Sequence, residues 1–300
     1  MVPTRPILQG SDALDMEGAA LKIGLTIHST DRSMSPVELA VEAEQRGFHS
    51  LYIPEHTHIP VSRRTPPPTG DEVLGEEYLR SLDPYVALAG AAVTTHSIRL
   101  GTGIGLVAQH DPITFAKELA TLDLLSNGRL VFGMGYGWNR EEMENHGIEV
   151  SRRRALVREK MLAMQALWSN EVAEFHGEFV NFEPSWQWPK PLQQPRPRTL
   201  IGGAAGPILF DHIAEYADGW LPIGGAGLRE GLVDLRRAIE ARGRSFEELH
   251  IAPMGVLPDA AKLEHYASLG CAEAVLRVPS APRDQLMPVL DEYARLYLGG

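Results

Sequence analysis

The feature that most constrains the fold is a regular alternation between short apolar strands and amphipathic helices. The first unit pairs an apolar stretch at residues 21–28 with a helical pattern that opens at Ser35-Pro36 and closes at Gly47. Alternating strands and helices indicate an α/β fold with a parallel sheet, and eight units predict a (β/α)8 TIM barrel rather than an open doubly wound sheet. The later strand patterns lie at residues 50–54, 98–107, 129–136, 199–202, 219–223, 250–256 and 273–278.

Two segments interrupt this alternation. Residues 57–80 contain three consecutive prolines after the second strand, and residues 173–198 are rich in aromatic residues and proline after the fourth unit. Strand and helix patterns resume directly afterwards, so we interpret both segments as insertions, after strands 2 and 4, rather than as linkers. Residues 1–20 show no sustained periodicity and are expected to form a tail or contact arm. We therefore predict a single barrel domain over residues 21–300.

Composition argues against several classes of function. The formal net charge of −11 disfavours nucleic acids and anionic membranes as partners, because both require clustered Lys and Arg. The single cysteine, Cys271, excludes an internal disulfide and fits a reducing cytosol. The sequence shows neither a signal peptide pattern nor an apolar run of about 18 residues. We expect a cytoplasmic protein.

The ends of the predicted strands are rich in glycine and poor in titratable groups. Leu100-Gly-Thr-Gly-Ile-Gly ends the third strand, and Gly133-Met-Gly-Tyr-Gly-Trp ends the fourth. In a barrel the carboxyl ends of the strands surround one mouth, and glycine there lets the backbone approach a flat ligand closely. Such a mouth favours a broad planar cofactor over a pair of catalytic carboxylates.

His56 and His58 follow the second strand, and the residues alone leave their role open. Two alternating imidazoles suit a metal site, but the later strand ends supply no further histidine, so we predict no metal. An imidazole at a barrel mouth is also suited to proton transfer near neutral pH, which is the role we favour for His56. A purely structural hydrogen bond to a loop is the alternative.

A second candidate binding element follows the fifth strand. In Gly202-Gly-Ala-Ala-Gly-Pro, small residues precede a helix and leave its first amide groups free to bind a phosphate. A tight turn between strand and helix is the alternative explanation. Three aromatic residues, Tyr136, Trp138 and Trp186, could line an aromatic pocket or serve only in packing.

Taken together, several motifs resemble the bacterial luciferase-like superfamily, and within it the branch that uses the deazaflavin coenzyme F420. The resemblance spans about residues 21 to 225. It implies an oxidoreductase that transfers hydride between F420 and a small organic substrate. An FMN-dependent two-component monooxygenase and a non-catalytic flavin-binding barrel remain alternatives. The motifs are Leu51-Tyr-Ile-Pro-Glu-His, Leu100-Gly-Thr-Gly-Ile, Ala116-Lys-Glu-Leu-Ala, Gly133-Met-Gly-Tyr-Gly-Trp-Asn and Ala217-Asp-Gly-Trp.

The resemblance also implies roles for individual residues. A non-prolyl cis peptide at Gly103–Ile104 would stand behind the central ring of the cofactor, and Glu55 with His56 would form the catalytic pair. Substrate would enter beside His28, His58 and Trp138. The residues expected to bind the cofactor are His56, Thr102, Gly103, Ile104, Gly135, Tyr136, Gly137, Trp138, Asn139, Gly202, Gly203, Ala204, Ala205 and Gly206.

The same resemblance implies partners. A homodimer is expected, through helices such as residues 111–127, and a separate cofactor-reducing enzyme would supply the reduced cofactor. The sugar-phosphate dehydrogenase of this group has a Glu where this chain has Trp138, which speaks against glucose-6-phosphate as the substrate.

Overall fold

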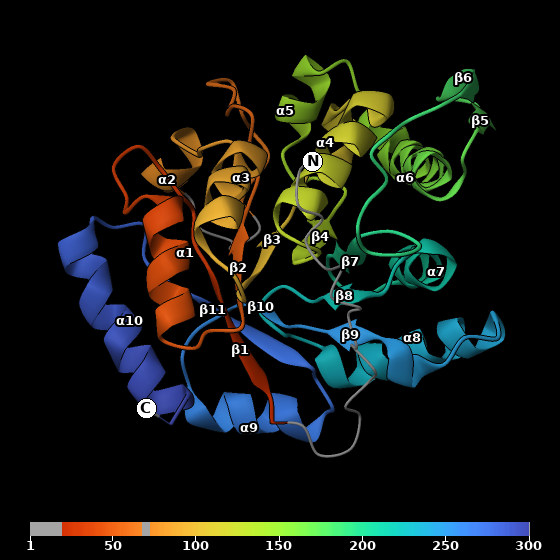
Figure 1. The fold of residues 1–300 in the computed structure, drawn as a ribbon. Coiled ribbons are helices and arrows are strands. Elements are labelled where there is room, and N and C mark those ends of the chain that lie inside the picture. Colours follow the sequence, from red (N-terminus) through yellow and green to blue (C-terminus); the bar gives the residue numbers. More distant parts are fainter. Residues whose placement is uncertain (1–19, 68–72, 300) are drawn as a thin grey trace, which may run out of the picture.

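The computed structural model describes residues 20–67 and 73–299 (Figure 1). The predicted tail or contact arm, residues 1–20, lies outside this part of the chain except for its last residue. The helices are α1 (Pro36–Gln45), α2 (Glu76–Leu79), α3 (Pro84–Thr94), α4 (Pro112–Leu125), α5 (Arg140–Asn145), α6 (Arg153–Ser169), α7 (Pro207–Tyr216), α8 (Leu228–Ala241), α9 (Ala260–Ser268) and α10 (Arg283–Tyr297).

The main sheet is parallel throughout and has nine strands in the order β10-β11-β1-β2-β3-β4-β7-β8-β9. Helices pack around its outside (Figure 1). The predicted α/β class is therefore confirmed. The strands are β1 (Lys22–Thr26), β2 (Ser50–Ile53), β3 (Arg99–Thr102), β4 (Leu130–Met134), β7 (Arg198–Gly202), β8 (Gly219–Leu221), β9 (His250–Ile251), β10 (Met254–Val256) and β11 (Glu273–Arg277).

One segment of chain forms both ends of the sheet. β9 pairs with β8 and β10 pairs with β11, and only Ala252 and Pro253 separate β9 from β10. The seventh strand, predicted as continuous over residues 250–256, is therefore divided, because proline has no N–H with which to continue the ladder. The sheet curls until its two ends meet at this segment.

Alternate residues of the strands face two different cores. Outward residues such as Leu25, Leu51 and Leu100 pack under the helices in the larger hydrophobic cluster. Inward residues form a separate cluster inside the curled sheet, and Ile104 packs against it from the loop after β3. The inward cluster contains Tyr52, Val131, Leu200, Leu221, Ala252, Met254 and Val275.

Asp-Pro pairs fix the starts of two helices, as the sequence predicts. The carboxylates of Asp83 and Asp111 accept hydrogen bonds at 2.9 Å from backbone amides three residues ahead, and proline occupies the first position of α3 and α4. An acceptor at this position satisfies an amide that the helix itself leaves unpaired. Ser35 precedes α1 without such a side-chain bond.

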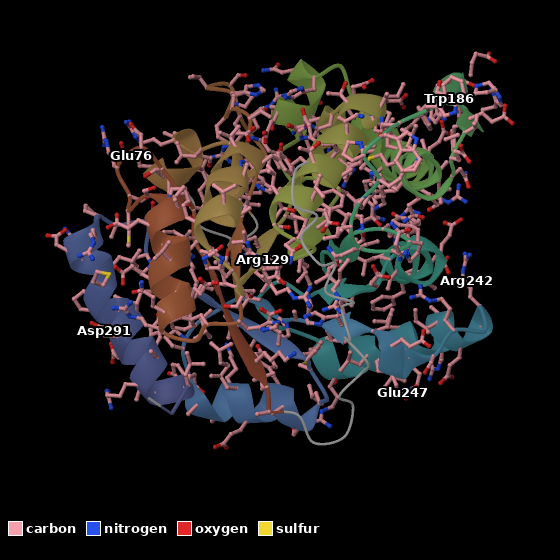
Figure 2. The ribbon with its side chains drawn as sticks, viewed as in Figure 1. Glu76, Arg129, Trp186, Arg242, Glu247 and Asp291 are labelled. Carbon is pink, nitrogen blue, oxygen red and sulfur yellow. The ribbon has the colours of Figure 1, made fainter. Side chains whose placement is uncertain are left out.

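The segment 173–198 forms structure outside the main sheet. Its strands β5 (Ala173–His176) and β6 (Asn181–Ser185) pair antiparallel, and this hairpin lies at the outer edge beyond α6 (Figure 1). Trp186 follows β6, is 76% exposed and projects at the periphery (Figure 2). Among the described residues it makes no ring contact with Tyr136 or Trp138, so the aromatic pocket considered for these three residues does not form.

Glu273 is a buried carboxylate at the amino end of β11. Tyr52 donates its hydroxyl to this carboxylate at 3.3 Å, His250 contacts it at 3.0 Å, and the Ser50 hydroxyl is also bonded to it. Burial alone would raise the pKa of Glu273, but the His250 and Ser50 contacts keep it below its ordinary value. The ionised form is therefore the one that stabilises the folded state.

We expect Glu273→Gln to lower the free energy of unfolding by about 2–4 kcal/mol at pH 7, because it removes a charge from a buried hydrogen-bonded group. The folded pKa lies below the unfolded value of about 4.3, so this contribution is complete above that value and is lost as the pH falls through the folded pKa. Urea denaturation of both proteins at pH 7 and pH 3.5 measures it. An equal deficit at both pH values would contradict the assignment.

Candidate active site

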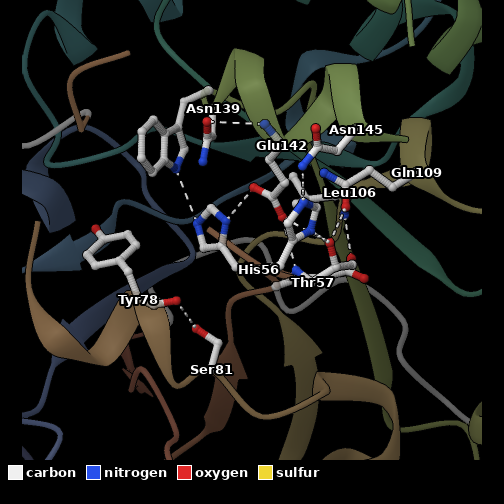
Figure 3. A network of polar contacts seen from close by, with 12 residues as sticks. His56, Thr57, Tyr78, Ser81, Leu106, Gln109, Asn139, Glu142 and Asn145 are labelled. Carbon is white, nitrogen blue, oxygen red and sulfur yellow. Dashed lines mark hydrogen bonds and ion pairs between the residues drawn. The ribbon is translucent and has the colours of Figure 1, made fainter. Parts of the chain in front are cut away.

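His56 lies at the carboxyl end of β2 and is held from two sides. Its Nδ1 lies 2.8 Å from Oε2 of Glu142 on α5, and its Nε2 lies 3.2 Å from the indole Nε1 of Trp138 (Figure 3). Indole N–H groups only donate, so Nε2 accepts and Nδ1 carries the proton that is donated to Glu142. The side chains of His56 and Glu142 are 6% and 1% exposed, which makes this a buried pair.

Glu142 is ionised at neutral pH. Burial alone would raise its pKa, but the contact with His56 and the hydrogen bond from the backbone amide of Thr57 hold the pKa below its ordinary value. A buried carboxylate of this kind stabilises the positively charged imidazolium form of its histidine partner. The pair is therefore equipped to take up and release a proton.

The predicted pair of Glu55 and His56 is not a contact pair. The Glu55 carboxylate accepts hydrogen bonds from the Leu106 amide at 2.6 Å and the Tyr85 hydroxyl at 3.1 Å, and it lies 2.6 Å from Nε2 of His110. Consecutive residues of extended backbone point in opposite directions, so only one of the two reaches the Glu142 side. The carboxylate that meets His56 comes instead from Glu142, 86 residues away.

The peptide bond Gly103–Ile104 is cis, as predicted. Glu55 holds this segment from both ends, since its amide donates to the Ile104 carbonyl at 3.1 Å and its carboxylate receives the Leu106 amide. Thr102, in contrast, is fully buried and donates its hydroxyl to the Gly133 carbonyl at 2.7 Å. The cis segment is thus anchored to the sheet and to β2.

Two glycines from neighbouring strands make room for the Ile104 side chain. A Cβ atom at Gly135 would stand 2.7 Å from Cδ1 of Ile104, and one at Gly202 would stand 2.5 Å from its Cγ2. Both separations are shorter than real van der Waals contacts, so any side chain at either glycine would displace Ile104. The predicted glycine-rich strand ends therefore shape the surface around the cis peptide.

Aromatic rings surround the His56 imidazole. The ring of Tyr78 on α2 lies 5.5 Å from His56, 4.4 Å from His28 and 6.1 Å from Trp138 (Figure 3). Tyr78 comes from the insertion after β2 and was not among the predicted site residues. Arg63, from the same insertion, lies 5.9 Å above the Trp138 ring. The insertion therefore covers one side of the mouth.

His28 and Asn139 each leave a buried nitrogen without a hydrogen-bond partner among the described residues, at Nδ1 and Nδ2 respectively. Burial, reinforced by His56 and Arg277, lowers the pKa of His28 to about 3, so its ring is neutral. Asn139 uses its Oδ1 to accept the Glu142 amide at 3.3 Å. Unpaired buried polar atoms cost free energy, and a ligand with a polar edge would satisfy them.

The outer rim carries a second polar group centred on Thr57. Its hydroxyl lies 2.9 Å from Nδ1 of His58 and 2.8 Å from Nε2 of His146, and Asn145 reaches His58 at 2.9 Å (Figure 3). His58 is exposed, so it lies on the rim and not beside His56. Within residues 20–67 and 73–299, no group of three or more His, Cys, Asp or Glu side chains could hold a metal ion.

Tyr136 and the turn after β7 complete the predicted set. The Tyr136 hydroxyl lies 2.7 Å from Nδ1 of His212 on α7, and Gly137 adopts a φ of 78°, which favours glycine. In the turn, Ala204 and Ala205 are exposed, and α7 begins without a side-chain cap. The uncapped start of α7 leaves backbone amides available to an anionic group.

Comparison with known proteins agrees with this architecture. The family model for luciferase-like monooxygenases matches residues 22–265. An uncharacterized protein of Mycobacterium tuberculosis is 42% identical over 274 residues, which cover 90% of this chain and 96% of that protein. The F420-dependent glucose-6-phosphate dehydrogenase of Kineococcus radiotolerans is 27% identical over 77% of this chain and 66% of its own length.

Solved structures share the fold. The monooxygenase RslO1 from Streptomyces bottropensis superimposes with a TM-score of 0.72 at 22% identity and covers 93% of this chain and 99% of its own. Relatives named as F420-dependent and as FMNH2-dependent enzymes both match the sequence. Within the part of the chain that the structure describes, no helix is long and apolar enough to cross a membrane. The chain belongs to the luciferase-like monooxygenase family.

Proposed function

We propose that this protein is an F420-dependent oxidoreductase that transfers hydride between the deazaflavin and a small organic substrate. The observation that carries the proposal is the buried pair of His56 and Glu142 at the same strand ends as the cis peptide Gly103–Ile104. Relatives that are named as F420-dependent support the choice of cofactor. FMN, used by other family members, is the competing cofactor.

The residues at the mouth fit a flat, polar-edged cofactor. Ile104, with Gly135 and Gly202 beside it, offers an apolar surface, and the unpaired nitrogens of His28 and Asn139 offer hydrogen-bonding groups. We assign ring contact to the segment 102–104, with Gly135, Gly137, Trp138 and Asn139 along the neighbouring strand end. The turn 202–206, with its open helix start, would receive the phosphate.

When bound, F420 supplies the carbon that donates or accepts hydride, so the protein needs no nucleophile of its own. His56 handles the accompanying proton. Because Nδ1 is committed to Glu142, the nitrogen that exchanges a proton with the substrate is Nε2. The ionised Glu142 stabilises the imidazolium while it exists, and the aromatic rings of Tyr78 and Trp138 keep water from the imidazole.

A polar path connects this pair to the surface. The second oxygen of Glu142, Oε1, lies 3.3 Å from the Thr57 hydroxyl, which in turn lies 2.8 Å from Nε2 of His146. His146 is exposed, so it exchanges protons freely with solvent. We assign this path, from His146 through Thr57 and Glu142, to the renewal of the proton on His56.

We expect Gly202→Ala to weaken F420 binding about tenfold, because the new methyl group must push Ile104 into the space for the cofactor. Titration of each protein with F420 and with FMN, followed by fluorescence, measures the affinity and identifies the preferred cofactor. The double variant with Ile104→Ala removes the colliding methyl group and should recover affinity relative to Gly202→Ala. Unchanged binding in the single variant, or a preference for FMN, would contradict the proposal.

A further inference from the structure

A second cavity lies at the amino ends of the strands, on the face of the sheet opposite to the mouth. Arg99 and Arg198 are the first residues of β3 and β7, and Asp218 directly precedes β8. Because parallel strands share one direction, these residues gather at the same edge of the sheet. The segment 192–196 forms one wall, and the cavity has a volume of about 470 Å³. It is large enough for a small metabolite.

Positive charge dominates the lining of this cavity. Three guanidinium groups, those of Arg99, Arg196 and Arg198, face one carboxylate, that of Asp218. That carboxylate is already committed, because Oδ1 pairs with Arg196 at 2.6 Å and Oδ2 accepts the Thr199 amide at 2.8 Å. The lining therefore carries cationic groups in excess of anionic ones, in a protein whose overall charge is negative.

Two of the guanidinium groups retain donors that nothing in the described residues satisfies. The Arg198 side chain makes no hydrogen bond or ion pair there, although it is only partly exposed. Nε of Arg196 is buried and has no partner either. A partly buried cation without an anionic partner is unfavourable, and its planar fork of N–H groups matches a carboxylate or phosphate.

The amide side chains beside these arginines are already occupied. Gln193 donates from Nε2 to Asp123 at 2.6 Å and to the Leu130 carbonyl at 2.8 Å. Gln194 donates to the Pro191 carbonyl at 2.9 Å. Asp123 lies fully buried behind Gln193, whose amide also bonds it, so it is not open to a ligand. The groups left to bind are therefore N–H donors with positive charge.

We propose that this cavity binds the oxyanion group, phosphate or carboxylate, of a small metabolite. The site is separate from the mouth in both place and chemistry, since it depends on arginines at strand starts and on none of the residues assigned to the cofactor. It does not rest on the proposed function. Occupancy would pair the free donors of Arg198 and Arg196 and would tie the segment 192–196 to the starts of β3 and β7.

Isothermal titration calorimetry with inorganic phosphate and, separately, with succinate tests the proposal and distinguishes the two oxyanions. We expect saturable binding of at least one of them in the absence of any cofactor. Arg198→Gln should weaken that binding about tenfold or more, because it removes a charge-assisted donor pair. The control, Arg295→Gln, removes the same charge from an exposed position on α10 and should leave the affinity unchanged.

Footprinting of the unaltered protein gives a second measurement that does not depend on a variant folding. Phenylglyoxal modifies accessible arginines, and mass spectrometry should show that the binding anion protects Arg196 and Arg198 but not Arg295. Absence of saturable binding for both anions, or equal protection of all three arginines, would overturn the proposal. Either failure leaves the F420 titration untouched, so the two proposals are judged separately.

Discussion

His56→Ala is expected to lower turnover by about 10²- to 10⁴-fold while F420 affinity changes little, because the variant loses the group that moves the proton but keeps the cis peptide surface. Binding is measured by fluorescence titration. Turnover is measured anaerobically, by the absorbance of F420 during reaction with a panel of small alcohols and carbonyl compounds.

Two companion variants sharpen this result. His96→Ala replaces an exposed histidine and should behave like the unaltered protein. Glu142→Gln keeps the shape of the partner but removes the charge that stabilises the imidazolium, so its turnover should lie between those of His56→Ala and the unaltered protein. If His56→Ala turned over normally, the imidazole would have only a structural role. If it lost cofactor affinity in proportion to turnover, the proton-transfer assignment would fail.

Arg129→Met is expected to lower the free energy of unfolding by about 3–5 kcal/mol, the largest stability change that we predict. Arg129 lies in the interior (Figure 2), where it donates to the carbonyls of Ala92, Thr95, Ile98 and Ser126 and to the Thr95 hydroxyl at 2.7–3.0 Å. Methionine would fill much of the volume but would leave all of these acceptors unpaired.

Urea denaturation measures the effect of Arg129→Met at a fixed pH. Arg295→Met is the matched control, because this arginine is exposed and its replacement should change the free energy of unfolding by less than about 0.5 kcal/mol. A loss of under about 1 kcal/mol in Arg129→Met would show that relaxation or water satisfies the carbonyls, and that the arginine does not hold the ends of α3 and α4 to the sheet.

The sequence predicts the strand and helix alternation well because each element carries its own signal. Asp-Pro pairs mark the starts of α3 and α4, and the hydrophobic period of each helix follows from the face that it buries. The division of the seventh strand at Pro253 was missed. An apolar run with one proline is still compatible with a continuous strand until its two neighbours are known.

The candidate site was predictable only where its residues follow strand ends. His56 and the cis bond at Gly103–Ile104 fall where the resemblance places them. Glu142 and Tyr78 were not predicted, because both lie on helices whose position relative to His56 depends on packing over long sequence separations. Glu55 was predicted as the partner of His56 from adjacency alone, and the alternation of an extended chain separates the two side chains.

The arginine-lined cavity at the opposite face illustrates a further limit of sequence patterns. Arg99 and Arg198 are 99 positions apart in the numbering, and each taken alone is an ordinary polar residue at the start of a strand. Only the order of the sheet, in which β4 alone separates β3 from β7, brings them to one place. Charge clusters of this kind follow from topology, not from local composition.

A crystal structure of the protein with F420 tests the central claim most directly. The account predicts that the deazaflavin ring lies against the cis peptide Gly103–Ile104, with His56 at the edge of the face left open for substrate. A ring bound elsewhere on the protein, or a mouth without the cofactor in crystals grown at saturating F420, would contradict it.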